Sequence, residues 1–132
     1  MTGQMTDDEM LDLMKRFRRG YGKADRDALA AATTEDFEWH MHYGEPGTDS
    51  PTGRVLKGID AVMEEIAWRQ ANWKNVTYAN MVERPAGDVI LQMFTTKGTD
   101  ENGKEYHLNV VDVYPIRDGL ICRKDTYWKG VR

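Results

Sequence analysis

The sequence predicts an α+β domain in which helices come first and strands dominate the second half. Three observations support this prediction. Apolar residues recur at helical spacing near residue 10 and again after Gly58, they alternate with polar residues between these segments, and only strand-like segments and short turns follow Asn75. Helices and strands that are segregated along a chain are typical of α+β domains. The length of 132 residues fits one domain, expected to span residues 1–132.

The first helix is predicted by its start signal. Thr6 followed by Glu9 is a capping box, in which each side chain accepts a hydrogen bond from a backbone N–H at the helix start. The apolar face that follows consists of Met10, Leu13, Met14 and Phe17. Gly20 and Gly22 are expected to end this helix.

Two further helices and a strand are predicted before residue 75. Asp25 is the expected N-cap of a short helix over residues 27–32. A half-buried strand is indicated by the alternating apolar residues Phe37, Trp39 and Met41. Residues 43–54 hold three glycines and two prolines, which predicts a loop. Gly58 leads into a third helix, whose apolar face consists of Ile59, Val62, Met63 and Ile66.

The second half of the chain is predicted to form a four-strand meander. The expected strands cover residues 76–84, 89–96, 106–116 and 120–128. Turn sequences rich in Gly, Pro, Asp and Asn separate them. Because such short turns join antiparallel neighbours, the sheet is expected to be mainly antiparallel.

Composition excludes several classes of protein. The 18 Lys and Arg against 22 Asp and Glu give a net charge of −4, which argues against nucleic-acid binding. The single Cys122 cannot form an internal disulfide, and no CxxC motif is present. The acidic start lacks the apolar core of a signal peptide, and no apolar run is long enough to span a membrane. A cytoplasmic protein is therefore expected.

Asp112 is the first candidate for chemistry. It interrupts an almost wholly apolar strand segment, residues 108–114. A carboxylate in such a segment must be paired, solvated in a pocket, or held protonated by its surroundings. The structural alternative is an ion pair with Arg123 or Lys124.

Several local patterns resemble a known superfamily. They are residues 35–40 (EDFEWH), 53–58 (GRVLKG), 111–114 (VDVY), 117–121 (RDGLI) and 123–128 (RKDTYW). With the element order, they resemble the nuclear transport factor 2-like superfamily, and within it the SnoaL-like polyketide cyclase and ketosteroid isomerase-like branch. The resemblance implies a cone-shaped α+β barrel, with three N-terminal helices packed on a strongly curved, mainly antiparallel sheet around a pocket. This fold hosts isomerases, cyclases, dehydratases, epoxide hydrolases and non-catalytic binders.

The resemblance assigns expected roles to two aspartates. Asp112 matches the strand position at which ketosteroid isomerases carry a pocket carboxylic acid. Asp125 lies at or beside the position of a catalytic aspartate in cyclases. Counting without a gap from Gly119 puts Thr126 on that position, whereas a one-residue bulge would restore Asp125. Because side chains alternate between faces, this single residue decides which of the two faces the pocket.

His40 is the third catalytic candidate. His40 and His42 share one face of their strand, and such a pair can hold a metal with a third ligand. The inward alternation of Trp39 and Met41 sends both histidines outward, so no metal and no cofactor are expected. A shift by one residue would make His40 the base.

The resemblance also indicates that catalytic residues of related enzymes are replaced in this chain. Met41 matches, within a residue, the general-base aspartate of ketosteroid isomerases, and Phe17 stands where they carry their oxyanion tyrosine. Met93 and Thr95 occupy positions at which epoxide hydrolysis needs Arg and Asp, so that reaction is rejected.

The pocket is expected to be apolar. Its predicted lining includes Tyr21, Trp39, Met41, Trp68, Phe94, Tyr114 and Tyr127. The first hypothesis is therefore a cofactor-independent acid/base enzyme of isomerase, cyclase or dehydratase type, acting on a small hydrophobic carbonyl- or hydroxyl-bearing molecule. The alternative is a non-catalytic binding or accessory domain. Outward residues such as Val111 and Val113 also suggest a homodimer through the open face of the sheet.

Overall fold

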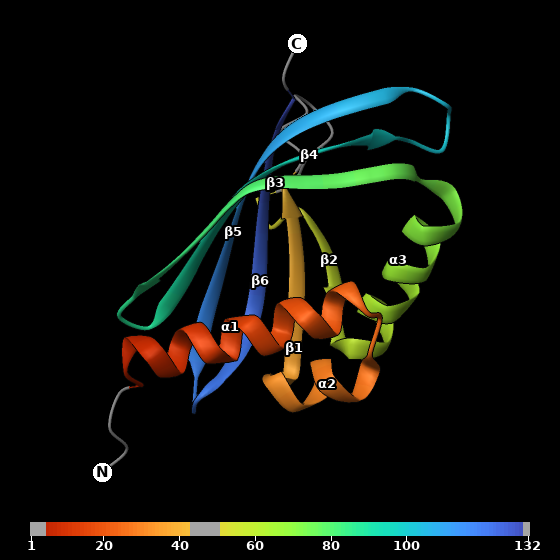
Figure 1. The fold of residues 1–132 in the computed structure, drawn as a ribbon. Helices are drawn as coiled ribbons and strands as arrows, with labels where there is room; N and C mark the ends of the chain where they lie inside the picture. Colours follow the sequence, from red (N-terminus) through yellow and green to blue (C-terminus); the bar gives the residue numbers. More distant parts are fainter. Residues whose placement is uncertain (1–4, 43–50, 131–132) are drawn as a thin grey trace.

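The computed structural model describes residues 5–42 and 51–130, which form three helices and six strands (Figure 1). The helices are α1 (Asp7–Gly22), α2 (Arg26–Ala32) and α3 (Gly58–Asn72). The strands are β1 (Thr33–His42), β2 (Arg54–Lys57), β3 (Lys74–Ala86), β4 (Val89–Thr99), β5 (Glu105–Arg117) and β6 (Leu120–Gly130). No helix of the described residues has the length and apolar character needed to cross a membrane.

All six strands belong to one sheet, in the order β2-β1-β6-β5-β4-β3. β1 runs parallel to β6, and every other neighbouring pair is antiparallel. The α+β prediction is thus confirmed, with one difference from the implied barrel: β2 and β3 form free edges, so the sheet stays open. The short strand β2 was not predicted, because only its pairing with β1 defines it.

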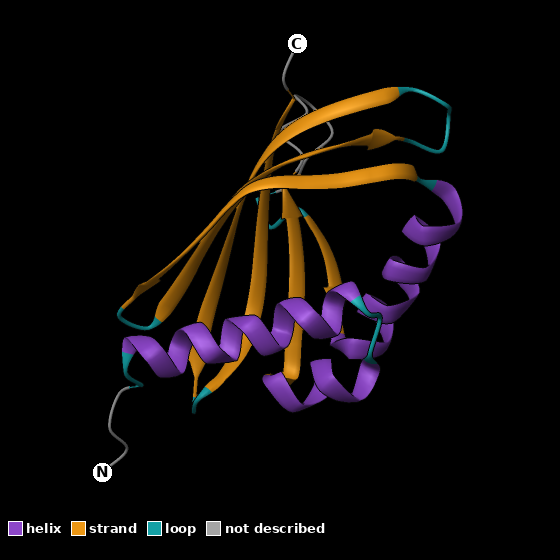
Figure 2. Cartoon of the chain, viewed as in Figure 1, coloured by secondary structure: helices purple, strands orange, loops and turns teal. Residues whose placement is uncertain are grey.

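The sheet is bent, and the helices lie on its hollow side (Figure 2). α1 crosses the sheet, and α3 lies at its side. In the sequence, α3 connects β2 to β3. The apolar core lies between the helices and the sheet, and its largest fully buried side chains include Phe17, Leu13, Phe37, Trp39 and Tyr114. We call the side of the sheet that faces the helices the hollow face, and the other side the outer face.

The predicted helix signals act as expected. Thr6 Oγ1 accepts a hydrogen bond from the Glu9 backbone N–H at 3.1 Å, and the Thr6 backbone N–H donates to Glu9 Oε1 at 3.0 Å. α1 ends at Gly22, as predicted. Gly20 has a further role, since a Cβ there would lie only 3.2 Å from the Cβ of Ala28. The glycine therefore lets α2 pack closely against α1.

Strand register decides which residues meet on the hollow face. Trp39 of β1 pairs with Lys124 of β6, and Asp112 of β5 pairs with Thr126 of β6. Relative to β5, β6 carries one extra residue between Ile121 and Asp125. After this bulge, Lys124, Thr126 and Trp128 of β6 lie on the hollow face, and Asp125 lies on the outer face.

Candidate functional site

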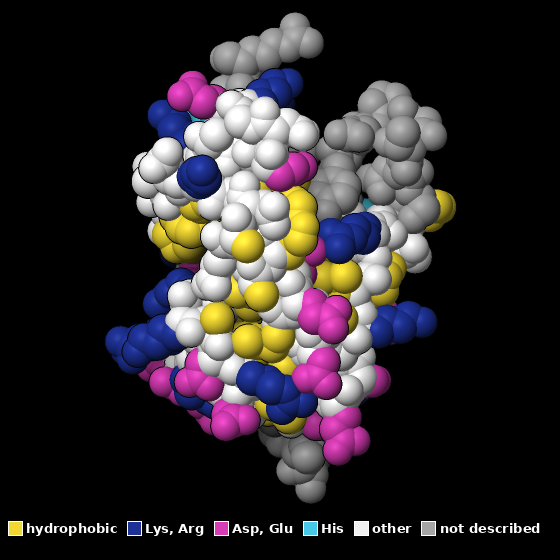
Figure 3. All heavy atoms as spheres, turned by 90° about the vertical axis from the view of Figure 1, so that its right-hand side faces the viewer, with side chains coloured by type: hydrophobic (Ala, Val, Ile, Leu, Met, Phe, Trp, Pro, Cys, Tyr) yellow, Lys and Arg dark blue, Asp and Glu magenta, His cyan; other side chains and the backbone are white. Residues whose placement is uncertain are grey.

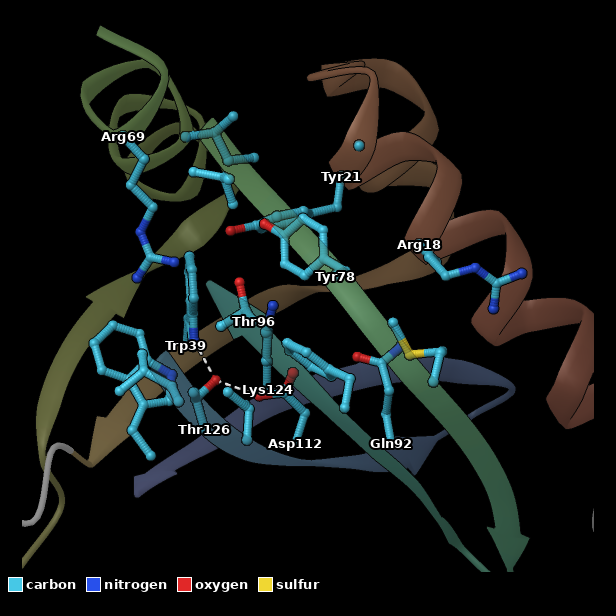
Figure 4. A pocket seen from close by; sticks show the side chains of 18 of the residues that line it. Arg18, Tyr21, Trp39, Arg69, Tyr78, Gln92, Thr96, Asp112, Lys124 and Thr126 are labelled. Atoms are coloured by element: carbon cyan, nitrogen blue, oxygen red, sulfur yellow. Dashed lines mark hydrogen bonds between the residues drawn. The ribbon is translucent and has the colours of Figure 1, made fainter. Parts of the chain in front are cut away.

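A cavity of about 710 Å³ opens between the hollow face and helices α1 and α3 (Figure 4). Its walls are largely aromatic and are contributed by Phe17, Tyr21, Trp39, Trp73, Tyr78, Phe94, Tyr106, Tyr114 and Trp128. Polar or charged side chains interrupt this surface on the sheet and on α3, among them Arg69, Gln92, Asp112, Lys124 and Thr126. Ligand cavities of this size, apolar with a few convergent polar groups, are typical of small-molecule sites.

Asp112 lies on the floor of this cavity and is 1% exposed. The Thr126 hydroxyl donates to Asp112 Oδ1 at 2.5 Å, and the Trp39 indole N–H donates to Thr126 Oγ1 at 2.8 Å. Burial raises the pKa of Asp112, while the Lys124 charge and the Thr126 hydrogen bond act in the opposite direction. The net result is a pKa above the ordinary value of a carboxyl group.

The second oxygen of Asp112 faces a hydrogen-bond chain through Tyr114. Gln92 Nε2 donates to Glu83 Oε2 at 2.7 Å, which leaves the Gln92 carbonyl oxygen as an acceptor 3.1 Å from the Tyr114 hydroxyl. The Tyr114 hydroxyl also lies 3.4 Å from Asp112 Oδ2 as a donor, and its single proton serves one acceptor at a time. The hydrogen bond from Tyr114 lowers the pKa of Asp112, but burial outweighs it and the pKa stays raised.

Lys124 enters the same cavity from β6, and its side chain is surrounded by aromatic rings. Nζ lies 4.2 Å from the ring centre of Tyr21 and 4.4 Å from that of Trp39. The residue is 7% exposed. Burial lowers the pKa of Lys124 from 10.5 to about 8, against the attraction of Asp112, which raises it. Near neutral pH a measurable fraction of this amine is neutral.

Arg69 forms part of the α3 wall of the cavity. Its guanidinium lies 4.8 Å from the Trp39 ring and 4.7 Å from the Trp73 ring, and its Nε donates to Glu65 Oε2 at 2.8 Å. Glu65 is 6% exposed and also pairs with Arg54 at 2.9 Å. Arg69 is thus held in place by a buried carboxylate, as a fixed positive wall.

Comparison with known proteins assigns the family. A family profile described as a SnoaL-like domain matches residues 14–124. This chain belongs to the SnoaL-like family. The resemblance found in the sequence is therefore confirmed, whereas no curated protein sequence matches the chain.

Solved structures agree with this family at the level of fold. A nuclear transport factor 2-like protein from Burkholderia xenovorans LB400 superimposes with a TM-score of 0.77 at 19% identity, covering 95% of this chain and 92% of its own. A protein from Xanthomonas campestris pv. campestris with a provisional polyketide cyclase name gives 0.70 at 19% identity, covering 93% and 92%. A protein from Catenulispora acidiphila with a ketosteroid isomerase-like fold, solved with trimethylamine, gives 0.65 at 15%, covering 87% and 83%.

In this SnoaL-like domain, Asp125 and His40 lie outside the cavity, on the outer face. Both Asp125 oxygens accept from Arg123 Nε, at 3.0 and 2.9 Å. His40 Nε2 lies 2.8 Å from Glu38 Oε1, and its Nδ1 lies 4.0 Å from Asp125. The structure therefore separates both residues from Asp112. The bulge in β6 did not bring Asp125 inward, and the count without a gap, which favours Thr126, agrees with the observed face.

The outer face also contains the set of residues that could approach a metal ion. One ligand atom from each of His40, His42 and Asp125 lies within 4.8 Å of the others. Arg123 already occupies both oxygens of Asp125, and its positive charge opposes a cation at that point. The arrangement as it stands is that of an ion-pair cluster.

The predicted substrate-binding residues divide into two groups. Tyr21, Trp39, Phe94 and Tyr114 line the cavity. Met41, Trp68 and Tyr127 do not: Met41 is fully buried in the core, Trp68 is 44% exposed beside a shallow second pocket, and Tyr127 stacks on His42 on the outer face at 4.5 Å.

Lys124 is the cavity residue that the sequence analysis treated only as a pairing partner for Asp112. Its place on the hollow face depends on the bulge in β6, which has no composition signal in the sequence. Gln92 was missed because an isolated polar residue in a strand usually faces solvent.

Proposed function

We propose that this protein is a cofactor-independent acid/base enzyme that acts on a small hydrophobic molecule with a carbonyl or hydroxyl group. The observation that carries this proposal is the carboxyl of Asp112, buried on the floor of an aromatic cavity, where desolvation raises its pKa. A carboxylic acid kept neutral by burial can donate a hydrogen bond or a proton to a substrate oxygen.

Lys124 is the second proton-transfer group of this proposed site. With a pKa of about 8 it has both a neutral and a charged form in the physiological range. Asp112 would protonate or hydrogen-bond the substrate oxygen, while the neutral Lys124 amine accepts a proton from the adjacent carbon. An acid and a base of this kind suffice for isomerisation, intramolecular aldol cyclisation or dehydration.

Proton exchange tests the proposal without knowledge of the natural substrate. A panel of hydrophobic ketones is incubated with the protein in D₂O, and deuterium uptake beside the carbonyl is followed by NMR. We expect Asp112→Asn to slow uptake by about 10²- to 10⁴-fold, the usual contribution of a general acid or base. Asp125→Asn is the matched control on the outer face and should leave uptake unchanged. Equal rates in the wild type and Asp112→Asn would overturn the proposal.

A non-catalytic binding domain is the second candidate. It is favoured by Phe17 and Met41, which replace the tyrosine and the aspartate that the isomerase resemblance would require. Binding can be measured separately, because the rings of Trp39, Trp73 and Trp128 line the cavity and ligand entry should quench their fluorescence. Quenching by a ketone that shows no deuterium uptake would favour this alternative.

We also propose a homodimer formed through the outer face. Met93, Val111 and Tyr127 are paired in a row across β4, β5 and β6 and are 37–47% exposed. Contiguous exposed apolar side chains are typical of association surfaces. On the surface around α3, hydrophobic side chains are broken up by acidic and basic ones (Figure 3). Light scattering after size exclusion should give twice the mass of 15.2 kDa, and Val111→Glu should reduce it to the monomer.

A further inference from the structure

The amine of Lys124 is buried among aromatic rings, and no carboxylate in the described part of the chain is paired with it, which is unusual for a lysine with a purely structural role. Within the described residues it makes no hydrogen bond and has no carboxylate oxygen within the 4 Å of a salt bridge, and its contacts are with aromatic rings. Buried lysines that serve structure are normally paired, because burying an unpaired charge is costly. The charged groups that act on it are Asp112 and Arg69, of opposite sign.

The remaining exposure of Lys124 is toward the cavity. Figure 4 shows its side chain rising from β6 beside Asp112 and Trp39 and below Tyr21. A carbonyl compound whose oxygen approaches Asp112 therefore has its carbonyl carbon within the part of the cavity that the amine borders. Desolvation in an apolar pocket is one of the ways in which proteins activate a lysine as a nucleophile.

We propose that Lys124 forms a covalent imine with carbonyl substrates in this cavity. This inference rests on the proposed function and modifies it in three respects. The substrate is an aldehyde or ketone, the activation is covalent, and Asp112 replaces Lys124 as the base at the adjacent carbon because Lys124 serves as the nucleophile. The surrounding rings fit this role: they keep water from the imine and stabilise the positive charge of its protonated form through cation–π contacts.

The step balances with the groups that the cavity contains. The lone pair of Lys124 Nζ forms a bond to the carbonyl carbon, and the carbonyl oxygen takes up the proton that the nitrogen loses, which gives a neutral carbinolamine. Asp112 donates its proton to the departing hydroxyl, which leaves as water, and a C=N bond forms. The resulting Asp112 carboxylate then removes a proton from the adjacent carbon, and the iminium accepts the electron pair to give an enamine. Reprotonation and addition of water release the product and restore both residues.

Reductive trapping tests this inference. The intact protein is incubated with 4-phenyl-2-butanone and cyanoborohydride, which reduces an iminium to a stable secondary amine, and the modified lysine is located by peptide mass mapping. The adduct adds the mass of the ketone less one oxygen. We expect Lys124 to be modified roughly tenfold or more faster than Lys129, an exposed lysine on the same strand, because the Lys124 amine borders the cavity that would hold the ketone and is partly neutral.

Two variants make the result decisive. Lys124→Arg keeps the positive charge but cannot form an imine, and it should lose the rapid adduct, whereas Lys129→Arg should retain it. Uniform modification of surface lysines, or an unchanged adduct in Lys124→Arg, would overturn the inference. Absence of any adduct in the wild type, together with Asp112-dependent deuterium uptake, would overturn covalent activation and leave the proposed acid/base function intact. The wild-type mapping keeps the test valid even if Lys124→Arg folds poorly.

Discussion

Lys124 and Asp125 are consecutive residues of β6, but they lie on opposite faces of the sheet and their charged groups have opposite surroundings. On the hollow face, Lys124 is held among aromatic rings, and burial lowers its pKa to about 8. On the outer face, Asp125 is held by two contacts to Arg123, whose side chain is 44% exposed. The outer face neutralises charge by pairing, whereas the hollow face leaves an amine and a carboxyl group in an apolar environment.

This difference indicates where chemistry is expected. Both faces contain carboxylates and cations, and each has an aspartate that is nearly fully buried, Asp112 at 1% and Asp125 at 8% exposure. Asp112 combines burial with a raised pKa and an adjoining cavity, whereas Asp125 is paired with Arg123 outside the cavity. Perturbed groups beside a cavity are better candidates for function than equally buried groups that are paired.

The largest expected contrast between the faces is in packing. Trp39→Ala should lower the free energy of unfolding by about 3–5 kcal/mol, because it removes a fully buried ring and leaves a void. Met93→Ala, on the outer face at 37% exposure, should cost less than about 1 kcal/mol. Urea unfolding followed by circular dichroism measures both changes.

If Trp39→Ala and Met93→Ala lowered the free energy of unfolding by similar amounts, the proposed difference in packing between the two faces would be wrong. If the loss for Met93→Ala is large and depends on protein concentration, the outer face is buried by a second copy, as the homodimer proposal requires. A large loss that does not depend on concentration would mean that the outer face is packed within the monomer.

How much the sequence could predict differs between the fold and the site. The capping box at Thr6, the N-cap at Asp25 and the alternation through Trp39 are local signals, and the structure agrees with all three. Asp112 was found because a carboxylate stands out in an apolar strand. Each of these signals is carried by neighbours within a few residues.

The remaining features of the site could not be predicted, because they depend on pairing between strands that are distant in the sequence. The β6 bulge decides that Lys124 and Thr126, and not Asp125, face the cavity. A shift of one residue exchanges the two faces, and nothing in the sequence near residue 122 marks where the extra residue lies. The hydrogen-bond chain through Gln92 likewise links three strands and cannot be predicted from any one of them.

The next expected effect concerns the charge on the hollow face. Lys124→Met should raise the free energy of unfolding near neutral pH by roughly 1–3 kcal/mol, because a depressed lysine pKa means that the folded state disfavours the charged form. In the wild type the unfolded chain binds more protons than the folded one between about pH 8 and pH 10.5, so wild-type stability rises with pH in that window. The advantage of the variant should therefore shrink as pH rises toward 10.5.

Urea unfolding across this pH range is the measurement. A variant that is less stable than the wild type near neutral pH, with a gap that does not change with pH, would mean that the rings of Tyr21 and Trp39 stabilise the ammonium more than burial penalises it. Loss of the imine and gain of stability in the same residue would be the expected pattern for a site that sacrifices stability for function.

The smallest expected effect has the opposite sign and lies one residue away. Arg123→Met removes a positive charge from the outer face, where the guanidinium donates to both oxygens of Asp125. The free energy of unfolding should fall by at most about 1 kcal/mol, as for other partly exposed ion pairs. At about 1 M NaCl the difference from the wild type should become smaller, because salt screens an exposed pair. Removing either of two adjacent cations would then stabilise the protein from the hollow face and destabilise it from the outer one. If Lys124→Met lowered stability as Arg123→Met does, burial would not penalise the Lys124 charge, and the distinction between the two faces would fail at the pair of residues where it is sharpest.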